Sequence, residues 1–185
     1  MEDAKLARAA ATGDRAAMDA LIKRYRRLVY SIAWKITLNE EDAMDVAQNV
    51  FLKMMDHIAS FNQRGPFRSW LASIAAHEAM NSLRRSHRTK EVSMDANVLE
   101  TLSPVRNNPA KNNPRSILEL KQRRDLVGRA MSILSPQQRA VLTLRLHQEM
   151  TPREIAAYLD IPSGQVRSQL CRAVCRLRDI LAGTK

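Results

Sequence analysis

The stretch TPREIAAYLDIPSGQVRSQL, residues 151–170, decides the fold of the C-terminal part of the chain. Thr151 is followed by Pro152 and, three residues after the threonine, by a glutamate. This pattern is typical of a capping box and predicts a helix that begins near Pro152. Pro162 ends that helix because it lacks a backbone N–H and disfavours helical geometry at the residue before it. Ser163 then caps a second helix, so the stretch predicts two helices joined by a short turn.

The second of these helices has an apolar side and a polar side. Residues at helical spacing form the apolar side: Val166, Leu170, Ala173, Val174, Leu177 and Leu181. The polar side carries Gln165, Arg167, Ser168, Gln169, Arg172 and Arg176. Arginine bonds guanine and glutamine bonds adenine through paired hydrogen bonds, and further basic residues meet phosphates. The pattern predicts a DNA-binding helix-turn-helix, with an ordinary hairpin bearing a solvated basic face as the alternative.

The composition favours an all-α protein. Of the 185 residues, 45% are hydrophobic, which suffices for one globular domain or two small helical ones. Aromatic residues make up only 4% and there are five glycines, while Ala, Leu, Arg, Met and Gln are abundant. The formal net charge of +11 favours a polyanionic partner. A basic soluble or ribosome-associated protein is the alternative reading of the charge.

The periodicity divides the chain into two helical domains. The first, residues 1–88, has three apolar stripes: Leu21, Ile22, Tyr25, Leu28, Val29, Ile32 and Ile36; Val46, Val50, Met54 and Ile58; and Leu71, Ile74, Ala75, Ala79 and Leu83. Residues 89–115 hold three prolines and five asparagines without a sustained period, and we expect a flexible linker there. The second domain spans residues 116–185. Caps at Asn39 and Ser135 mark two more helix starts.

Several classes of function are disfavoured by the sequence. Cys171 and Cys175 lie four residues apart, without a second pair to complete a zinc site, and we expect them to pack on the apolar side of their helix. We expect no metal and no cofactor. No phosphate-binding glycine loop or nucleophile-base motif indicates an enzyme. No apolar run is long enough for a membrane span, and the acidic, alanine-rich start is not a signal peptide, so we expect a cytoplasmic protein without membrane insertion.

Two sets of motifs resemble one known family. LSPQQRAVLTLRLHQEMTPREIAAYLDIPSGQVRSQLCRAVCRLRDIL is similar to the promoter-recognition domain of bacterial sigma factors of the extracytoplasmic-function (ECF) group of the sigma-70 family. RYRRLVYSIAWKIT, DAMDVAQNVFLKMM and FRSWLASIAAHEAMNSLRR resemble the N-terminal domain of the same group, in the same order. The resemblance covers about residues 21–181 apart from the linker. It implies sigma domain 2 at residues 1–88 and sigma domain 4 at residues 116–185.

The resemblance implies that the first domain binds core RNA polymerase, through the clamp helices of the largest subunit. The matching residues are Asp42, Asp45, Gln48 and Asn49. Independently of the family, residues 38–50 carry four acids and no base, which suits a basic partner and repels DNA. A solvated acidic helix start is the alternative. Met44 and Asn49 stand where the family commonly has glutamates, which either weakens polymerase binding or is compensated elsewhere.

The resemblance also implies recognition of promoter DNA at two elements. For the −10 element the matching residues are Asn62, Gln63, Arg64, Phe67, Trp70, His77, Asn81, Arg84 and Arg85. In this family the loop at 62–66 captures a flipped base, and strand opening then needs no catalytic residue because contacts with the extruded base and the backbone offset unstacking. Phe67 and Trp70 at i, i+3 spacing fit core packing better than stacking on bases. Ala76 and His77 replace the family's common Arg-Asn pair.

For the −35 element the resemblance implies the six polar residues of the recognition helix. Gln169 stands where the family usually has an arginine, so we expect an altered −35 preference, while Arg172 and Arg176 suit phosphates. Members of the group are typically held inactive by an anti-sigma factor, which is therefore an expected partner. The alternative function is a sigma-like DNA-binding regulator or adaptor that does not initiate transcription.

Overall fold

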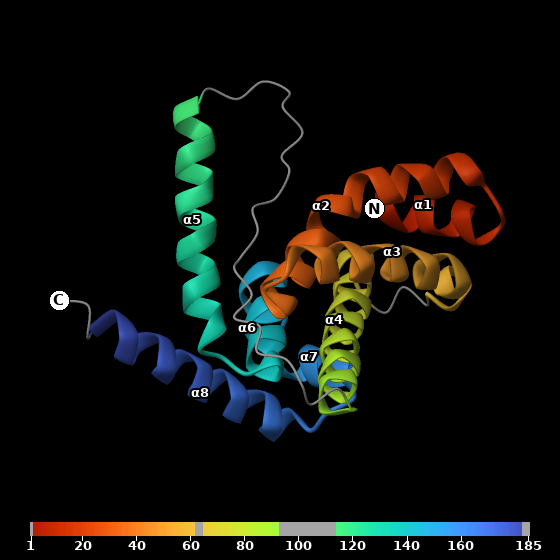
Figure 1. Ribbon diagram of the computed structural model, residues 1–185. Coiled ribbons are helices and arrows are strands. Elements are labelled where there is room, and N and C mark those ends of the chain that lie inside the picture. The colour runs from red at the N-terminus through yellow and green to blue at the C-terminus, as the bar shows by residue number, and fades with distance from the viewer. Residues whose placement is uncertain (1, 62–64, 93–113, 183–185) are drawn as a thin grey trace.

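The computed structural model describes residues 2–61, 65–92 and 114–182, and these residues are helical throughout apart from short connections, with no strand among them. The helices are α1 (Glu2–Ala11), α2 (Arg15–Thr37), α3 (Glu40–His57), α4 (Phe67–Val92), α5 (Pro114–Ser132), α6 (Pro136–Gln148), α7 (Pro152–Leu159) and α8 (Ser163–Ala182), with a 3₁₀ turn, η1 (Ile58–Ser60), after α3. The all-α prediction is confirmed. Figure 1 shows α5 projecting from the body, while α4, α6 and α7 lie together near its centre.

The predicted helix starts are confirmed by their capping hydrogen bonds. The Ser135 hydroxyl accepts the backbone N–H of Gln138 at 3.3 Å, and the Gln138 side chain accepts the N–H of Ser135 at 3.0 Å. Thr151 and Glu154 form the same reciprocal pair at 3.3 and 2.7 Å. The Asn39 side chain accepts an N–H in the first turn of α3 at 3.0 Å. These side chains satisfy backbone donors that a helix leaves unpaired at its start.

The turn before α8 differs slightly from the prediction. Helix α8 begins at Ser163 itself, and the carbonyl of Pro162 accepts the N–H groups of Gln165 and Val166 at 2.9 and 3.2 Å. Asp160 closes α7 in the left-handed conformation, with φ of 50°. The chain therefore enters the second helix one residue earlier than a serine cap predicts.

The outer ends of the predicted linker are helical. Helix α4 continues to Val92, and α5 begins at Pro114. Proline is favoured in the first turn of a helix because its missing N–H has no partner there in any case. The remaining residues of the predicted linker, 93–113, lie outside the described residues.

The apolar stripes of the first domain form its core. In the first stripe Leu21, Val29 and Ile36 are fully buried, all four residues of the second stripe are buried, and so are Leu71, Ala75 and Ala79 of the third. The rest of the first and third stripes is buried or packs against this cluster. In α8, by contrast, Val174 is 55% exposed, so its placement on the apolar side was wrong. Four of the other predicted apolar positions of α8 are buried or packed against a core cluster, and Leu181 lies among the residues whose side chains are not described.

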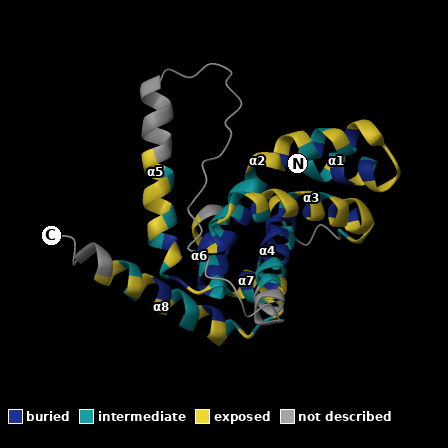
Figure 2. Cartoon of the chain, in the orientation of Figure 1, coloured by how far each residue is buried: buried dark blue, intermediate teal, exposed yellow. Residues whose placement is uncertain are grey.

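The two domains share one core, which the sequence did not predict. Helix α6 packs on α2 and α4, helix α7 packs on α4, and Figure 2 shows buried residues where α4 and α6 lie side by side. The cluster of buried side chains that contains the first domain also includes Ala140, Val141, Leu144, Met150, Ile155, Leu159 and Val166 of the second. A smaller cluster of Met131, Leu134, Leu142 and Ala173 holds α5, α6 and α8 together.

Lys35, near the end of α2, gives the protein a pH-dependent stability. Burial lowers the pKa of Lys35 to about 8, from its ordinary value of 10.5. Between these pH values the unfolded chain holds a proton that the folded chain has released, so stability rises with pH across this window. Below about pH 8 both states are protonated, and the folded state carries the full cost of a partly desolvated ammonium.

We expect a Lys35→Met variant to melt at a higher temperature at pH 7, by on the order of 3 °C, because solvent screening of a partly exposed charge limits the gain to about 1 kcal/mol. The difference from the parent shrinks as the pH approaches 10. Thermal melting of both proteins from pH 7 to 10 measures it. Parallel curves for the two proteins would contradict the assignment.

Candidate promoter and polymerase interfaces

The recognition helix α8 presents most of its predicted DNA-binding side chains to solvent. Gln165, Arg167, Arg172 and Arg176 are exposed, and Ser168 and Gln169 are half-buried. Val166 and Ala173, on the opposite side, are fully buried and fix the rotation of the helix. A helix held this way offers guanidinium and amide groups at the spacing that a major groove accepts.

Two of these six residues also have partners inside the second domain. Gln169 donates to the side chain of Gln137 at 3.4 Å. Arg176 donates to the carbonyl of Ile133 at 3.3 Å and to the side chain of Gln138 at 3.2 Å. Arg176 therefore joins α8 to the connection between α5 and α6, a structural task that the sequence did not reveal.

The cysteines of α8 are less buried than expected. Cys171 is exposed and Cys175 is half-buried, so the prediction that both pack on the apolar side was wrong for Cys171. Leu170 and Ala173 face the core, and this rotation turns Cys171 outward. Among the described residues no three His, Cys, Asp or Glu side chains gather in a way that could hold a metal ion.

Phe67 and Trp70 belong to an aromatic cluster at the start of α4. The Phe67 ring is 3% exposed and lies 5.4 Å from Tyr25, 5.3 Å from Phe61 and 5.3 Å from Trp70, between ring centroids. Tyr25 in turn donates to Asp3 of α1 at 2.7 Å, and burial raises the pKa of this tyrosine. Phe67 is therefore part of the core of the first domain. Asn62, Gln63 and Arg64 lie outside the described residues.

The second domain contacts the predicted −10 surface directly. Nε2 of His77 lies 2.9 Å from the carbonyl oxygen of Tyr158 in α7. A Cβ placed on Gly65 would lie 2.8 Å from the hydroxyl oxygen of Tyr158, so only glycine fits the loop here with this ring in place. Arg68 donates to the side chain of Gln148 at 2.7 Å. These contacts bring α6 and α7 against the start and the middle of α4.

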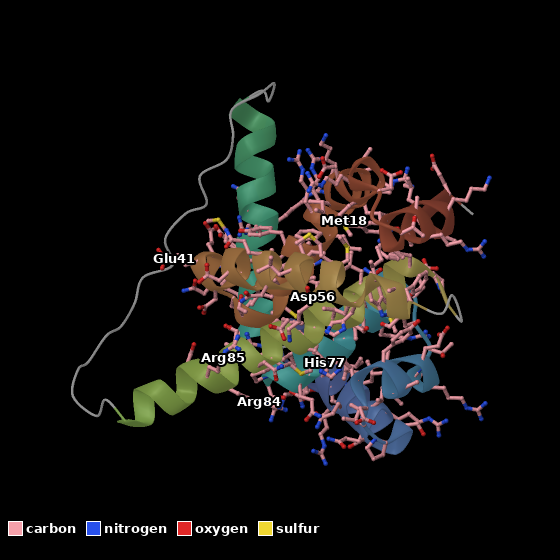
Figure 3. All side chains as sticks on the ribbon, turned by 90° about the vertical axis from the view of Figure 1, so that its right-hand side faces the viewer. Met18, Glu41, Asp56, His77, Arg84 and Arg85 are labelled. Carbon is pink, nitrogen blue, oxygen red and sulfur yellow. The ribbon has the colours of Figure 1, made fainter. Side chains whose placement is uncertain are left out.

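Ala76 and His77, the departures from the family's Arg-Asn pair, both lie in this region. Ala76 is fully buried in the core that the two domains share. His77 makes the contact with α7 described above. Farther along α4, Asn81 is half-buried while Arg84 and Arg85 are exposed, and Figure 3 shows both arginines beyond His77 toward the far end of the helix. The arginines are well placed to meet phosphates.

A buried carboxylate beside this region was missed by the sequence reasoning. Glu78 is 3% exposed and pairs with Lys53 of α3 at 2.5 Å. Both line a cleft of about 380 Å³ between the domains, together with His57, Trp70, His77 and Tyr158. The sequence did contain a signal for this ion pair: Glu78 lies among the apolar residues of the third stripe, at positions 75 and 79. A carboxylate on the buried side of a helix needs a charged or hydrogen-bonding partner.

Helix α3 exposes a surface in which acids and large apolar side chains alternate. Asp45, Gln48 and Asn49 are exposed and Asp42 is half-buried. On the same outward side Met44 is 52% exposed, Leu52 55% and Met55 44%. Exposed methionine and leucine beside polar groups are typical of a protein-binding surface. Figure 3 shows Glu41 at one end of this helix and Asp56 toward the other.

Two arginines of the second domain hold the junction between α2 and α3. Arg124 of α5 pairs with Glu40 at 2.9 Å, donates to the Tyr30 hydroxyl at 3.2 Å and lies 4.5 Å above the centre of the Trp34 ring. Arg139 of α6 donates to the carbonyl of Ile36 at 2.6 Å, at the negative end of α2, and burial lowers its pKa. Neither interdomain contact was predicted from the sequence.

Comparisons with known proteins identify both domains. The family model of sigma-70 region 2 matches residues 21–89, and that of sigma-70 region 4 matches residues 124–177. The ECF RNA polymerase sigma factor SigE of Mycolicibacterium smegmatis is 32% identical over 176 residues, which cover 93% of this chain and 65% of the relative. The ECF RNA polymerase sigma-E factor of Escherichia coli is 31% identical over 163 residues, covering 87% of this chain and 84% of the relative.

Two solved structures have the same fold. CnrH, in complex with the cytosolic domain of CnrY, has a TM-score of 0.68 and 23% identity, with all of both chains covered. The sigma factor RpoE of Bartonella quintana, in complex with the anti-sigma factor NepR, has a TM-score of 0.67 and 18% identity, covering 89% of this chain and 96% of that one. Across the described residues, no helix is long and apolar enough to cross a bilayer. The order of its matched regions and its likeness to relatives over 65% and 84% of their lengths show that the chain belongs to the ECF group of the sigma-70 family and is an RNA polymerase sigma factor.

Proposed function

We propose that this chain binds core RNA polymerase through α3, reads the −35 element with α8 and the −10 element with α4 and the loop before it, and promotes opening of the DNA. Sigma factors act as specificity subunits and are not enzymes, so every step rests on binding. The observation that carries the proposal is the separation of two chemically different surfaces: basic and amide groups on α8, and acids with apolar side chains on α3.

The polymerase-binding role of α3 is supported by its charge and by its exposed apolar residues. The acids of α3 stand out in a chain with a net charge of +11, so they attract a basic partner and disfavour DNA. Met44 replaces a glutamate of the family pattern and is half exposed. A thioether at this place can bury against a partner, which compensates part of the lost charge.

The −35 role rests on α8, where Gln165, Arg167 and Arg172 are exposed. The −10 role rests on the exposed arginines of α4 and on the loop that precedes it. Opening the duplex requires only that contacts with extruded bases and phosphates offset the cost of unstacking, which is a few kcal/mol for each step. No catalytic group is needed for this.

An anti-sigma factor is the partner that we propose beyond polymerase and DNA. The RpoE structure with the same fold was solved with an anti-sigma factor bound. A partner that covers α3 would block polymerase directly. Because its proposed partners are RNA polymerase and promoter DNA, we propose that the protein works in the cytoplasm.

Run-off transcription tests the proposed function. Purified core RNA polymerase is given a library of genomic promoter fragments, with and without the full chain. Transcripts that appear only with the chain, and that share a two-part upstream motif, are the expected result. DNA binding without transcripts would instead favour a sigma-like regulator or adaptor, and an Arg167→Ala variant controls for non-specific stimulation.

Exchange of Gln169 for arginine tests the −35 assignment. A Gln169→Arg variant should prefer guanine at one position of the element, because arginine pairs with its O6 and N7, with a discrimination of about 1 to 3 kcal/mol. Selection from a library of −35 sequences measures the change. An Arg172→Ala variant is the matched comparison, since loss of a phosphate contact weakens binding to all sequences and lowers the salt dependence. An unchanged preference in Gln169→Arg would remove Gln169 from the readout.

A further inference from the structure

Helix α2 exposes a group of cations that the proposed function does not use. Lys23, Arg26 and Arg27 are all exposed. They follow one another at i, i+3 and i, i+4 spacing, so they lie on one side of the helix. Together they are called the basic patch below. The only acid of α2 is Asp19, one turn before the patch begins.

The basic patch has no partner within the described part of the chain. Its three side chains form no hydrogen bond or ion pair there, whereas Arg24 in their midst pairs with Glu2 and Asp3 of α1. Like charges three and four residues apart on a helix repel one another and destabilise it. The cluster is therefore unfavourable for the free chain, and an anionic partner would relieve the repulsion.

The patch is separate from the two surfaces that we propose to read promoter DNA. The opposite side of α2, with Leu21, Tyr25 and Val29, is buried in the core that α2 forms with α3, α4 and α6. The patch therefore faces away from α4. Figure 1 shows α2 in the upper part of the molecule and α8 along its lower edge. The basic patch is thus not an extension of either DNA-reading helix.

The phosphates of DNA are the partner whose chemistry fits this patch. Lysine and arginine neutralise phosphates whatever the base sequence, and residues 23–27, KRYRR, contain no amide side chain for a base edge. One helical turn of about 5.4 Å separates the first cation from the other two, which lets long side chains reach neighbouring phosphates of one strand. The surface proposed for polymerase on α3 is acidic, so a cationic surface suits the opposite kind of partner.

We propose that the basic patch is a third DNA-contacting surface, which holds phosphates of the duplex that flanks the −35 and −10 elements and reads no sequence. The proposal rests on the proposed function, because it takes promoter DNA as the partner. Such a contact changes the affinity for DNA and its salt dependence, and it leaves the choice of promoter unchanged.

A triple variant, Lys23→Gln with Arg26→Gln and Arg27→Gln, tests the patch in the full chain bound to core polymerase. Glutamine is a good helix former and the positions are exposed, so the melting temperature should not fall. Each lost phosphate contact reduces the slope of log affinity against log salt by about 0.9. With a promoter fragment from the run-off assay, we expect the slope to decrease by roughly 2 to 3, and the affinity at about 0.1 M salt to fall at least about tenfold.

Three comparisons locate the effect. The charge-matched control is Lys5→Gln with Arg15→Gln and Arg129→Gln, which removes three exposed cations scattered over α1, α2 and α5. Its DNA affinity should stay within about threefold of the parent, because dispersed charges act only at long range and are screened by salt. A promoter fragment trimmed to the two elements should bind the parent and the triple variant equally. The affinity of the labelled triple variant for core polymerase without DNA should match that of the parent.

Several outcomes would overturn the basic patch. They are an unchanged salt slope in the triple variant, an equal loss in the charge-matched control, an equal loss on the trimmed fragment, and a loss of affinity for core polymerase in place of DNA. The last outcome would make the patch a polymerase-binding surface. In each case run-off transcripts from the parent would still support the proposed function.

The basic patch can also stand without the proposed function. If the parent gives no transcripts with polymerase, the same salt titration is made with the free chain and a random-sequence duplex. A reduced slope in the triple variant, with the charge-matched control unchanged, would then keep the patch as a DNA-binding surface while the proposed function fails. Equal slopes in the three proteins would overturn the patch as well.

Discussion

A Phe67→Ala variant loses about 3 to 5 kcal/mol of the free energy of unfolding, the usual cost of removing a buried aromatic ring. Phe67 is 3% exposed and contacts three other aromatic rings, from α2, from the segment after η1 and from α4 itself. A natural domain is stable by only about 5 to 15 kcal/mol, so this loss takes much of the total. Urea or thermal unfolding measures it.

A second variant, Phe67→Leu, separates a core role of Phe67 from a DNA-binding role. Phe67→Leu, which keeps an apolar side chain, should cost clearly less stability than alanine. Single-strand binding per folded molecule should be nearly unchanged in Phe67→Leu at low temperature. A variant of normal stability with lost −10 binding would show instead that the ring acts on DNA.

An Asp45→Arg variant binds core RNA polymerase at least roughly thirtyfold more weakly, a loss of about 2 kcal/mol, because a complementary charge becomes a repulsive one. Asp45 is exposed on the outer side of α3, so its replacement leaves the core intact. Titration of fluorescently labelled chain with core polymerase measures the affinity. Transcription in the run-off assay should fall in parallel at limiting concentrations of the chain.

Asp19→Arg on α2 is the matched control for this change. Asp19 is also exposed, undergoes the same change of charge and lies on another helix. Its polymerase affinity should stay within about threefold of the parent, the range for a long-range electrostatic effect. Equal losses in the two variants would mean that the net charge matters and that α3 is not the binding surface.

Local features of this fold were predictable because their causes are local. The capping boxes at Ser135 and Thr151 depend on side chains within three residues, and the structure shows the expected hydrogen bonds. The apolar stripes of α2, α3 and α4 follow from the helical period, and most of their members are buried. The predictions failed for residues at the edge of an apolar side, where the helical period does not decide between core and solvent. Val174 and Cys171 lie at such an edge of α8 and face solvent.

The sequence was enough to predict which types of side chain the candidate surfaces carry and on which helices. It was not enough to predict which of these side chains have partners elsewhere in the fold. The recognition helix was assigned from glutamine and arginine at exposed positions, and its polar side is indeed largely exposed. Nothing local indicated that Arg176 bonds Ile133 and Gln138, or that His77 meets Tyr158. These pairs are separated by between 38 and 81 positions in the chain, too far for any periodic pattern.

The sequence alone determined the helices, their caps and the chemistry of each surface, because these follow from side chains within a few turns of one another. Only the tertiary structure decided that the two domains share a core and that α7 rests on α4. Arg124 and His77 show the reason: an arginine on α5 finds its partners on α2 and α3, and a histidine on α4 meets a backbone carbonyl of α7. Such contacts depend on where the helices lie in space, which no single segment encodes.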